Sequence, residues 1–436
     1  MIIGVAQVEQ GTGVLRVAPG DIVTPLARER ARDLGRAIEV TGGGSVRGAQ
    51  SAGEARASGL AQNRDRRNRR RSAGSPTAPQ TDGTRPLGAT PSLAEVRRPP
   101  LTAITYRRAG KVHGLVPEGG PERSGARHGR AVCVGSGYVG TTVALRLAES
   151  GVYDEVVITD IKDGLAAGTA LDLWHGASIM GFSTRVRGTE SIVDAGPADI
   201  YVVTAGRARQ PGMTRADLAE TNAAIVRSVA AEIRATSPDA VVLVVTNPLD
   251  EMCDLMWRET GFPHRRVIGM AGLLDTARFR SLLALEPEVG NPDDVTAHAL
   301  GSHGAEMVIP LSQVTVRGRP AAEVVPEQRL EAVVDRARTS GGEVVGLLKT
   351  GSAYLTPGTA AAQMAIAITT DAGTVFPSAV KPDGVYDLPD VHVGLPAELG
   401  SGGVRRVVKL DLTEDELREL GLAASAIEDR LLTMRA

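Results

Sequence analysis

A glycine-rich turn between an apolar strand and a helix is the feature that most constrains this chain. Residues 135–140 read Gly-Ser-Gly-Tyr-Val-Gly, which is the pattern G-x-G-x-x-G. Residues 131–135 form a short apolar run that predicts a strand, and residues 138–150 carry apolar side chains at helical spacing. A strand that enters a helix through such a turn is typical of a βαβ unit. We therefore expect an α/β fold around a parallel sheet.

The three glycines and one acidic residue predict a dinucleotide site. Gly135 allows the tight turn, Gly137 lets the backbone approach a pyrophosphate, and Gly140 lets helix and strand pack closely. Asp160 ends the next predicted strand, where it can accept hydrogen bonds from both hydroxyls of the adenosine ribose. It would repel a 2′-phosphate, so NAD is favoured over NADP. The alternative is a glycine turn beside an ordinary surface aspartate.

The order of elements after residue 129 predicts two domains. Near-continuous Val/Ile strands that alternate with helices indicate a Rossmann-type, doubly wound parallel sheet in residues 129–272. The remainder, 273–436, predicts a second, catalytic α+β domain with antiparallel strands. The further expected strands are 155–160, 198–206, 240–248, 307–316 and 403–412, and a long helix is expected at 216–235.

Residues 1–128 differ in composition from the rest of the chain. They hold 21 Lys and Arg against 11 Asp and Glu, whereas the other 308 residues hold 28 against 40. One of the twelve aromatic residues, Tyr106, lies there. This composition cannot bury enough apolar surface to offset chain entropy, so we expect a largely disordered, low-complexity N-terminal extension. Within residues 1–40, Thr24-Pro25 and Gly35 predict the two ends of a short helix.

An arginine-rich run inside this extension has two interpretations. Asn63 to Arg71 carries six arginines, which suits contact with a nucleic acid or another polyanion. The alternative is a solvated linker, or translated sequence upstream of the true start. We favour the alternative because no aromatic residue is interleaved to stack on bases. Nucleic-acid binding is not expected, although the extension remains a candidate arm for recruiting a partner protein.

Several classes of protein are excluded by simple counts. Two cysteines, Cys133 and Cys253, exclude a disulfide-stapled secreted fold and a Cys-rich zinc module. No apolar run approaches the roughly 20 residues of a membrane helix, and no basic n-region precedes the apolar start. We expect a cytoplasmic protein without a membrane or metal site.

Four further clusters carry chemistry at the carboxyl ends of predicted strands or in the second domain. The cluster at 204–215 places several arginines on a Gly/Pro loop, at the edge of the sheet where ligands bind. In the cluster at 269–280, Asp275 and Arg278 share a helix face. The clusters are TAGRARQPGMTR (204–215), TNPLD (246–250), GMAGLLDTARFR (269–280) and GSHG (301–304).

Together with the glycine turn, these motifs resemble the lactate/malate dehydrogenase family over residues 129–436. The resemblance implies that His303 is the general acid/base and that Asp275 is its partner. Arg278 would hold the C1 carboxylate and Arg215 would polarise the keto oxygen. The remaining implied contacts are Asn247 to substrate and nicotinamide, and Asn222 and the backbone at Val245 to NAD.

Arg209 decides the substrate that the resemblance implies. It occupies the family's mobile loop, where an arginine matches a distal carboxylate and a glutamine suits pyruvate. The expected reaction is reversible oxidation of (S)-malate to oxaloacetate, a step of the tricarboxylic acid cycle, by a homodimer or homotetramer. The alternatives are an L-lactate or other 2-hydroxy-acid dehydrogenase, or a catalytically weakened NAD-binding homologue. The last is motivated by Ala305, because the family usually has Asp after the His-Gly pair.

Overall fold

The computed structural model describes residues 129–207 and 215–435, with short pieces of the first forty residues (2, 3, 8, 13–18, 22, 23 and 30–40). These residues fall into two compact units, one within Met1–Arg97 and one within Arg98–Ala436. Each unit is described by itself. Residues 41–128 are outside the described residues, so the disorder expected there and the arginine run at 63–71 stay predictions.

The N-terminal unit contains two pairs of very short parallel strands. β1 (Ile2–Ile3) pairs with β3 (Ile22–Val23), and β2 (Leu15–Val17) pairs with β4 (Ile38–Val40). Val8, Val17 and Ala31 form a small buried cluster. The predicted helix is helical at residues 30–33 and is followed by Gly35 in the left-handed conformation (φ 66°). Strands of two or three residues are too short for an alternating pattern, so the sequence did not predict them.

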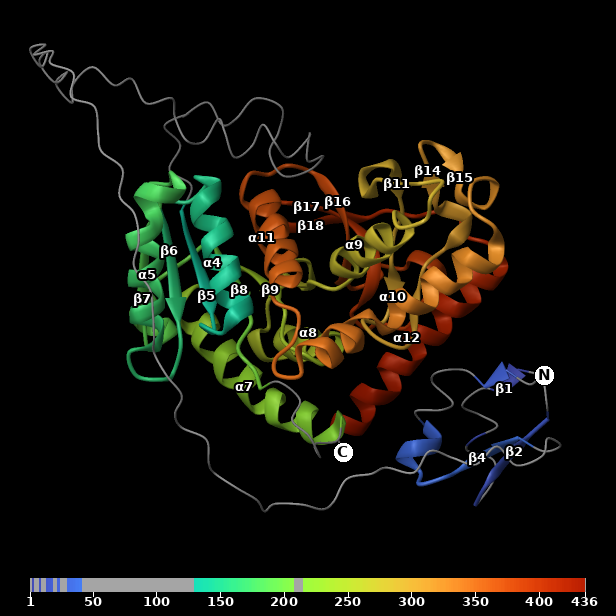
Figure 1. Cartoon of the computed structure of the whole chain (residues 1–436). Helices are drawn as coiled ribbons and strands as arrows, with labels where there is room; N and C mark the ends of the chain where they lie inside the picture. The colour runs from blue at the N-terminus through green and yellow to red at the C-terminus, as the bar shows by residue number, and fades with distance from the viewer. Residues whose placement is uncertain are drawn as a thin grey trace, which may run out of the picture. The chain divides into compact units, whose positions relative to one another are not determined.

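The large unit begins with the predicted doubly wound sheet, which is confirmed. Six strands are parallel, in an order that matches the dinucleotide-binding arrangement 3-2-1-4-5-6. Figure 1 shows these strands side by side, with helices packed against them. From the edge inward they are β7 (Arg185–Thr189), β6 (Glu155–Thr159), β5 (Arg130–Val134), β8 (Ile200–Val203), β9 (Val241–Val244) and β10 (Val267–Gly269).

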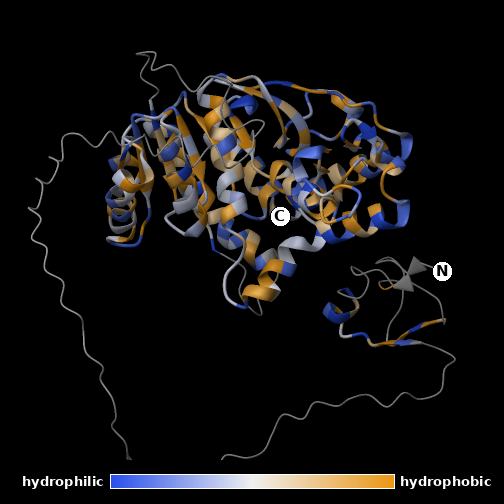
Figure 2. Cartoon of the chain, turned by 45° about the horizontal axis from the view of Figure 1, so that its top comes forward, coloured by the Kyte–Doolittle hydropathy of each residue, from blue (hydrophilic) through white to orange (hydrophobic). Residues whose placement is uncertain are grey.

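Both faces of this sheet are buried, which explains the unbroken apolar runs. Ala131 and Cys133 of β5 join the core on one face, whereas Val132 and Val134 join the core on the other. The strands of the sheet are coloured largely as hydrophobic in Figure 2. The first face is covered by α4 (Tyr138–Ser150), α5 (Leu165–Met180) and α11 (Leu355–Thr369), and the second by α6 (Ile192–Ala195), α7 (Arg215–Thr236) and α8 (Leu249–Thr260).

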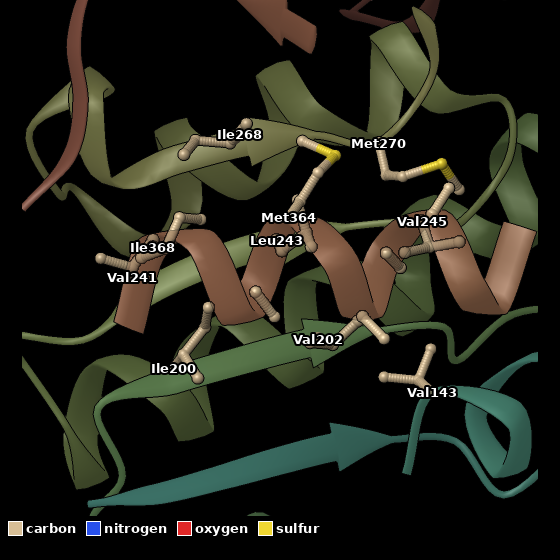
Figure 3. Close-up of a cluster of buried hydrophobic side chains, with 14 of the residues drawn as sticks. Val143, Ile200, Val202, Val241, Leu243, Val245, Ile268, Met270, Met364 and Ile368 are labelled. Atoms are coloured by element: carbon tan, nitrogen blue, oxygen red, sulfur yellow. The ribbon is translucent and has the colours of Figure 1, made fainter. Parts of the chain in front are cut away.

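Helix α11 connects the two predicted domains through the first core. Figure 3 shows it crossing β8, β9 and β10, with Met364 and Ile368 among the side chains of those strands. The small residues of this helix, such as Ala361 and Ala365, are fully buried. They permit a close approach of the helix to the sheet.

The sheet continues without interruption into the C-terminal half. β10 pairs with β9 in parallel and with β16 in antiparallel orientation, through Gly269 and Ala379. In the described part of the chain this gives one sheet of 11 strands. The added strands are β16 (Thr374–Val380), β17 (Val393–Gly400), β12 (Leu300–Gly301), β13 (Met307–Val308) and β18 (Gly403–Val407).

The rest of the C-terminal half is the expected mixture of helices and antiparallel strands. One expectation there was wrong: 307–316 is not one strand, because a 3-10 turn after Pro310 separates β13 from β14. The strand expected at 403–412 ends at Val407. The division at residues 272 and 273 stays a prediction. The other elements are α9 (Gly272–Leu283), α10 (Glu327–Leu348), α12 (Glu414–Arg435), β11 (Val295–Thr296), β14 (Thr315–Val316) and β15 (Arg319–Pro320).

A buried group of charged residues also connects the two halves. Asp254 of α8 lies 2.9 Å from Lys381 Nζ, just after β16, and 3.5 Å from His392 Nδ1, just before β17. Arg258 Nε contacts its other oxygen at 2.5 Å. Burial opposes the charged form, but these partners hold the pKa of Asp254 well below its usual range. None of the described helices is both long and apolar enough to cross a membrane.

Candidate active site

The glycine turn has the geometry that a bound pyrophosphate needs. Gly135 has a φ of 104°, and a Cβ there would lie 2.9 Å from the backbone nitrogen of Ala205. A Cβ on Gly140 would overlap the carbonyl oxygen of Gly135. Gly137, the N-cap of α4, opens onto free space, and no side chain in the described part of the chain caps the helix. The first amides of α4 are therefore available to an anion, which a helix N-terminus favours.

Asp160 lies beside this turn and holds it in shape. Its Oδ2 accepts hydrogen bonds from the backbone nitrogen of Ser136 at 2.8 Å and from Ser136 Oγ at 3.2 Å. Its Oδ1 accepts from the backbone nitrogen of Lys162. A carboxylate at the end of β6 is in the position where a ribose is bound in this type of fold. The contact to ribose stays a prediction.

Asn222 of α7 ties together the two loops at the carboxyl edge of the sheet. Its Nδ2 donates to the carbonyl oxygen of Asn247 at 2.6 Å and to that of Arg207 at 3.2 Å, while its Oδ1 accepts from the backbone nitrogen of Arg207. The side chain is buried. Asn222 therefore positions the loops after β8 and β9, and its predicted contact to NAD stays a prediction.

His303, Asp275 and Arg278 lie in direct contact. Nδ1 of His303 is 2.7 Å from Oδ2 of Asp275, and Nη1 of Arg278 is 3.2 Å from Oδ1 of the same carboxylate. The side chain of Asp275 is 6% exposed and that of His303 is 17% exposed. One buried carboxylate therefore orients both an imidazole and a guanidinium.

The electrostatic surroundings favour the charged form of His303. Burial lowers the pKa of His303, but the charge and hydrogen bond of Asp275, together with the charge of Asp250, outweigh it. The nearby Arg278 opposes them. The net result is a pKa above the ordinary value for histidine, so the ring holds its proton to a higher pH.

Asp250, at the start of α8, supports the loop that carries His303. Its Oδ2 accepts from Ser302 Oγ at 2.7 Å and from the backbone nitrogen of His303 at 3.0 Å. Its Oδ1 is buried and has no hydrogen-bond partner among the described residues. Burial and the neighbouring Glu251 raise the pKa of Asp250 to about 7.

A cavity of about 760 Å³ opens beside this group. Asn247, whose side chain is exposed, and His303 both line it. Val245 is buried at the end of β9, where its nitrogen donates to the carbonyl oxygen of Val203. Arg209 lies outside the described residues. Arg215 is the first residue of α7, and its side chain also lies outside them.

Sequence reasoning missed the residues that surround the histidine loop. Asp250 falls within one of the identified motifs but received no role, and Glu251, Ser302 and Arg430 received none either. Glu251 carried a usable signal: a second acid beside Asp250 at the start of an amphipathic helix. Buried carboxylates are rare without a partner. The partner, Arg430, lies 179 residues further along the chain, so spacing could not identify it.

Family comparisons match almost the whole of the large unit. Residues 130–269 match the lactate/malate dehydrogenase NAD-binding domain, and residues 273–434 match the lactate/malate dehydrogenase alpha/beta C-terminal domain. A malate dehydrogenase of Rhodopirellula baltica is 45% identical over 310 residues, covering 71% of this chain and 98% of the relative. One of Chloroherpeton thalassium is 44% identical, covering 68% and 95%.

Solved structures agree with this relationship. The malate dehydrogenase of Salinibacter ruber has a TM-score of 0.67 at 40% identity, covering 70% of this chain and 97% of that one. A lactate dehydrogenase of Cryptosporidium parvum, solved with lactic acid and nicotinamide adenine dinucleotide, has a TM-score of 0.67 at 33% identity. It covers 70% of this chain and 98% of the other.

Proposed function

This chain belongs to the lactate/malate dehydrogenase family, and on that premise we propose that it is an NAD-dependent malate dehydrogenase. The reaction is (S)-malate + NAD⁺ ⇌ oxaloacetate + NADH + H⁺. The single observation that carries the proposal is the contact of His303 and Arg278 with one buried carboxylate, Asp275. This arrangement provides an acid/base next to a carboxylate-binding group.

His303 is proposed to move the proton of the reaction. When bound, NAD⁺ accepts a hydride from C2 of malate. Because Nδ1 of His303 is bonded to Asp275, Nε2 is the nitrogen left to take the proton of the malate hydroxyl. Asp275 stabilises the imidazolium that results, and in the reverse direction the protonated ring returns the proton to the keto oxygen.

Four further residues are proposed to hold the substrate. The Arg278 guanidinium pairs with the C1 carboxylate, to which its planar donor geometry is suited. Asn247 contacts substrate and nicotinamide, which its exposure toward the cavity of His303 supports. Arg215 is proposed to polarise the keto oxygen. Arg209 is proposed to bind the distal carboxylate.

NAD is proposed to bind at the carboxyl edge of β5 and β6. The open space at Gly137 and the N-terminus of α4, which no described side chain caps, support a pyrophosphate there. Gly135 and Gly140 allow the turn, and Asp160 is proposed to bind the adenosine ribose. Asn222 and the backbone at Val245 are proposed to complete the contacts to NAD.

The test compares two 2-oxo acids in one assay. We expect NADH oxidation at 340 nm to be faster with oxaloacetate than with pyruvate. Arg209→Gln should shift the ratio of kcat/KM values toward pyruvate, because a glutamine offers no charge to the second carboxylate. Arg207→Gln is the matched control, since Arg207 is an exposed arginine of the same loop. A wild-type preference for pyruvate would instead identify a lactate dehydrogenase, and NADH binding without turnover would identify a catalytically weakened homologue.

We further propose that the protein acts in the cytoplasm, in the tricarboxylic acid cycle, as a homodimer or homotetramer. Both cysteines are free and buried, which suits a reducing compartment. Helix α5 presents the apolar side chains of Leu171, Trp174 and Ile179 to solvent, which supports a contact between subunits. Light scattering of the native protein measures the assembly, and a monomer at micromolar concentration would contradict it.

A further inference from the structure

The loop that carries His303 has no acidic side chain directly after the histidine, because Gly304 and Ala305 follow it. The following residue, Glu306, is charged and partly buried. Side chains from helices elsewhere in the chain contact the two ends of this loop.

Arg430 of the C-terminal helix α12 contacts both ends of this loop. Its Nη2 donates to Ser302 Oγ at 3.0 Å, and its Nη1 lies 3.4 Å from Glu306 Oε2. Its Nε pairs with Oε1 of Glu251 on α8. One guanidinium therefore joins the residues on either side of His303 to helix α8.

The contacts continue from Arg430 to the backbone of His303. Ser302 Oγ accepts from Arg430 and donates to Asp250 Oδ2, and the same carboxylate oxygen accepts from the backbone nitrogen of His303. A displacement of Arg430 would thus reach the backbone nitrogen of His303 through three hydrogen bonds.

Burial makes this arrangement sensitive to the loss of its cation. Asp250 is 2% exposed and Glu251 is 4% exposed, and the nearby carboxylates raise the pKa of Arg430 against the effect of its own burial. Two buried carboxyl groups beside each other are costly unless a positive charge compensates them. Arg430 supplies that charge.

We propose that Arg430 is a positioning residue for His303, and that with Glu251 and Asp250 it holds the histidine loop in place. This inference rests on the proposed function, because the orientation of the acid/base matters only if His303 moves a proton. Arg430 lines the same cavity as His303, and the role proposed for it is to hold the loop, not to contact substrate or cofactor.

The experiment separates positioning from simple stability. Arg430→Met removes the cation and leaves Glu251 unpaired, so both thermal stability and kcat should fall. The double variant Glu251→Met with Arg430→Met removes both charges, so stability should return. Because Ser302 and Glu306 still lack their donor, kcat should remain roughly ten- to a hundred-fold below wild type, as expected for a misplaced catalytic group. Arg430→Lys, which reaches fewer partners, should lie between wild type and Arg430→Met.

A matched control and a second measurement complete the test. Arg418→Met removes an exposed arginine of the same helix, paired only with Asp415 among its described ion pairs, and should keep wild-type values. The second measurement is the rate at which diethyl pyrocarbonate modifies His303, at a pH on the plateau of each variant's pH profile. Peptide mass spectrometry monitors the modification. A loosened loop should raise this rate several-fold in both Arg430→Met variants and leave it unchanged in Arg418→Met.

The two proposals fail in different ways. If the wild type reduces no 2-oxo acid, the proposed function fails, while the modification rate still tests the role of Arg430. If the double variant recovers kcat and the wild-type modification rate together with its stability, then Arg430 serves stability alone and the positioning role is refuted.

Discussion

Asp275→Asn is the most direct test of the proposed proton transfer. In the wild type the carboxylate of Asp275 lies 2.7 Å from Nδ1 of His303 and stabilises the imidazolium. The amide of asparagine carries no charge, so the pKa of His303 should fall. Reduction of oxaloacetate needs the protonated ring. The raised pKa of His303 keeps the protonated form present to higher pH. When the charge of Asp275 is removed and this pKa falls, activity should decline at a lower pH in the variant.

The size of the effect follows from the burial of the pair. A hydrogen bond to a charged partner contributes about 1.5–3 kcal/mol, and screening by water is weak because the Asp275 side chain is 6% exposed. Every 1.4 kcal/mol is a factor of ten. We therefore expect kcat/KM for oxaloacetate to fall roughly 10- to 150-fold at pH 8, and less at pH 6.

The assay is steady-state NADH oxidation from pH 5.5 to 9. Asp335→Asn is the matched control, since Asp335 makes the same i,i+3 pair with an arginine, Arg338, but is 63% exposed. Its kcat/KM should stay within about two-fold of wild type, as is usual for exposed pairs. An Asp275→Asn enzyme with an unshifted pH profile and a loss no larger than that of the control would refute the assignment of Asp275.

Three other predictions concern the scaffold. Lys381→Met should lower the free energy of unfolding in urea by about 3 kcal/mol, because Asp254 keeps a buried charge with fewer partners; a loss below 1 kcal/mol would contradict this. Since the folded-state pKa of Asp254 is depressed, its contribution to the free energy of unfolding is present above about pH 4 and is lost as the pH falls further. Acid titration of the wild type and of Lys381→Met would compare this loss. Gly140→Ala should abolish NADH binding measured by fluorescence, because the methyl group overlaps the carbonyl of Gly135; retained binding would show that the turn adapts. Burial raises the pKa of the Cys133 thiol to about 12, so a thiol reagent at pH 8 should label it only after denaturation, and rapid labelling of the native protein would disprove its burial.

The nucleotide-binding half of the fold was predictable because its strands are buried on both faces. Continuous apolar runs such as 200–203 and 241–244 are unmistakable, and the helices between them show regular spacing. The short strands β12 and β13 were not predictable as such. Each has two residues, and each exists because neighbouring strands pair with it, so tertiary contacts and not local pattern define them.

The candidate active site also has a part that the sequence predicted and a part that it did not. The motif residues His303, Asp275 and Arg278 come together in the structure, and the motifs identified them by residue type and order. The residues behind them could not be found by motif. Arg430 reaches the histidine loop from the last helix, and its role depends on a three-dimensional contact that no spacing within the sequence encodes.

The unbroken sheet also determines how this protein can be divided in the laboratory. β10 ends at Gly269 and pairs on one side with β9 and on the other with β16, where Gly269 leaves room for Ala379. A fragment that stops at residue 272 would expose the edge of a fully buried apolar strand, which invites aggregation. The nucleotide-binding half is therefore no detachable module, and chimaeras with relatives should exchange β10 and β16 together.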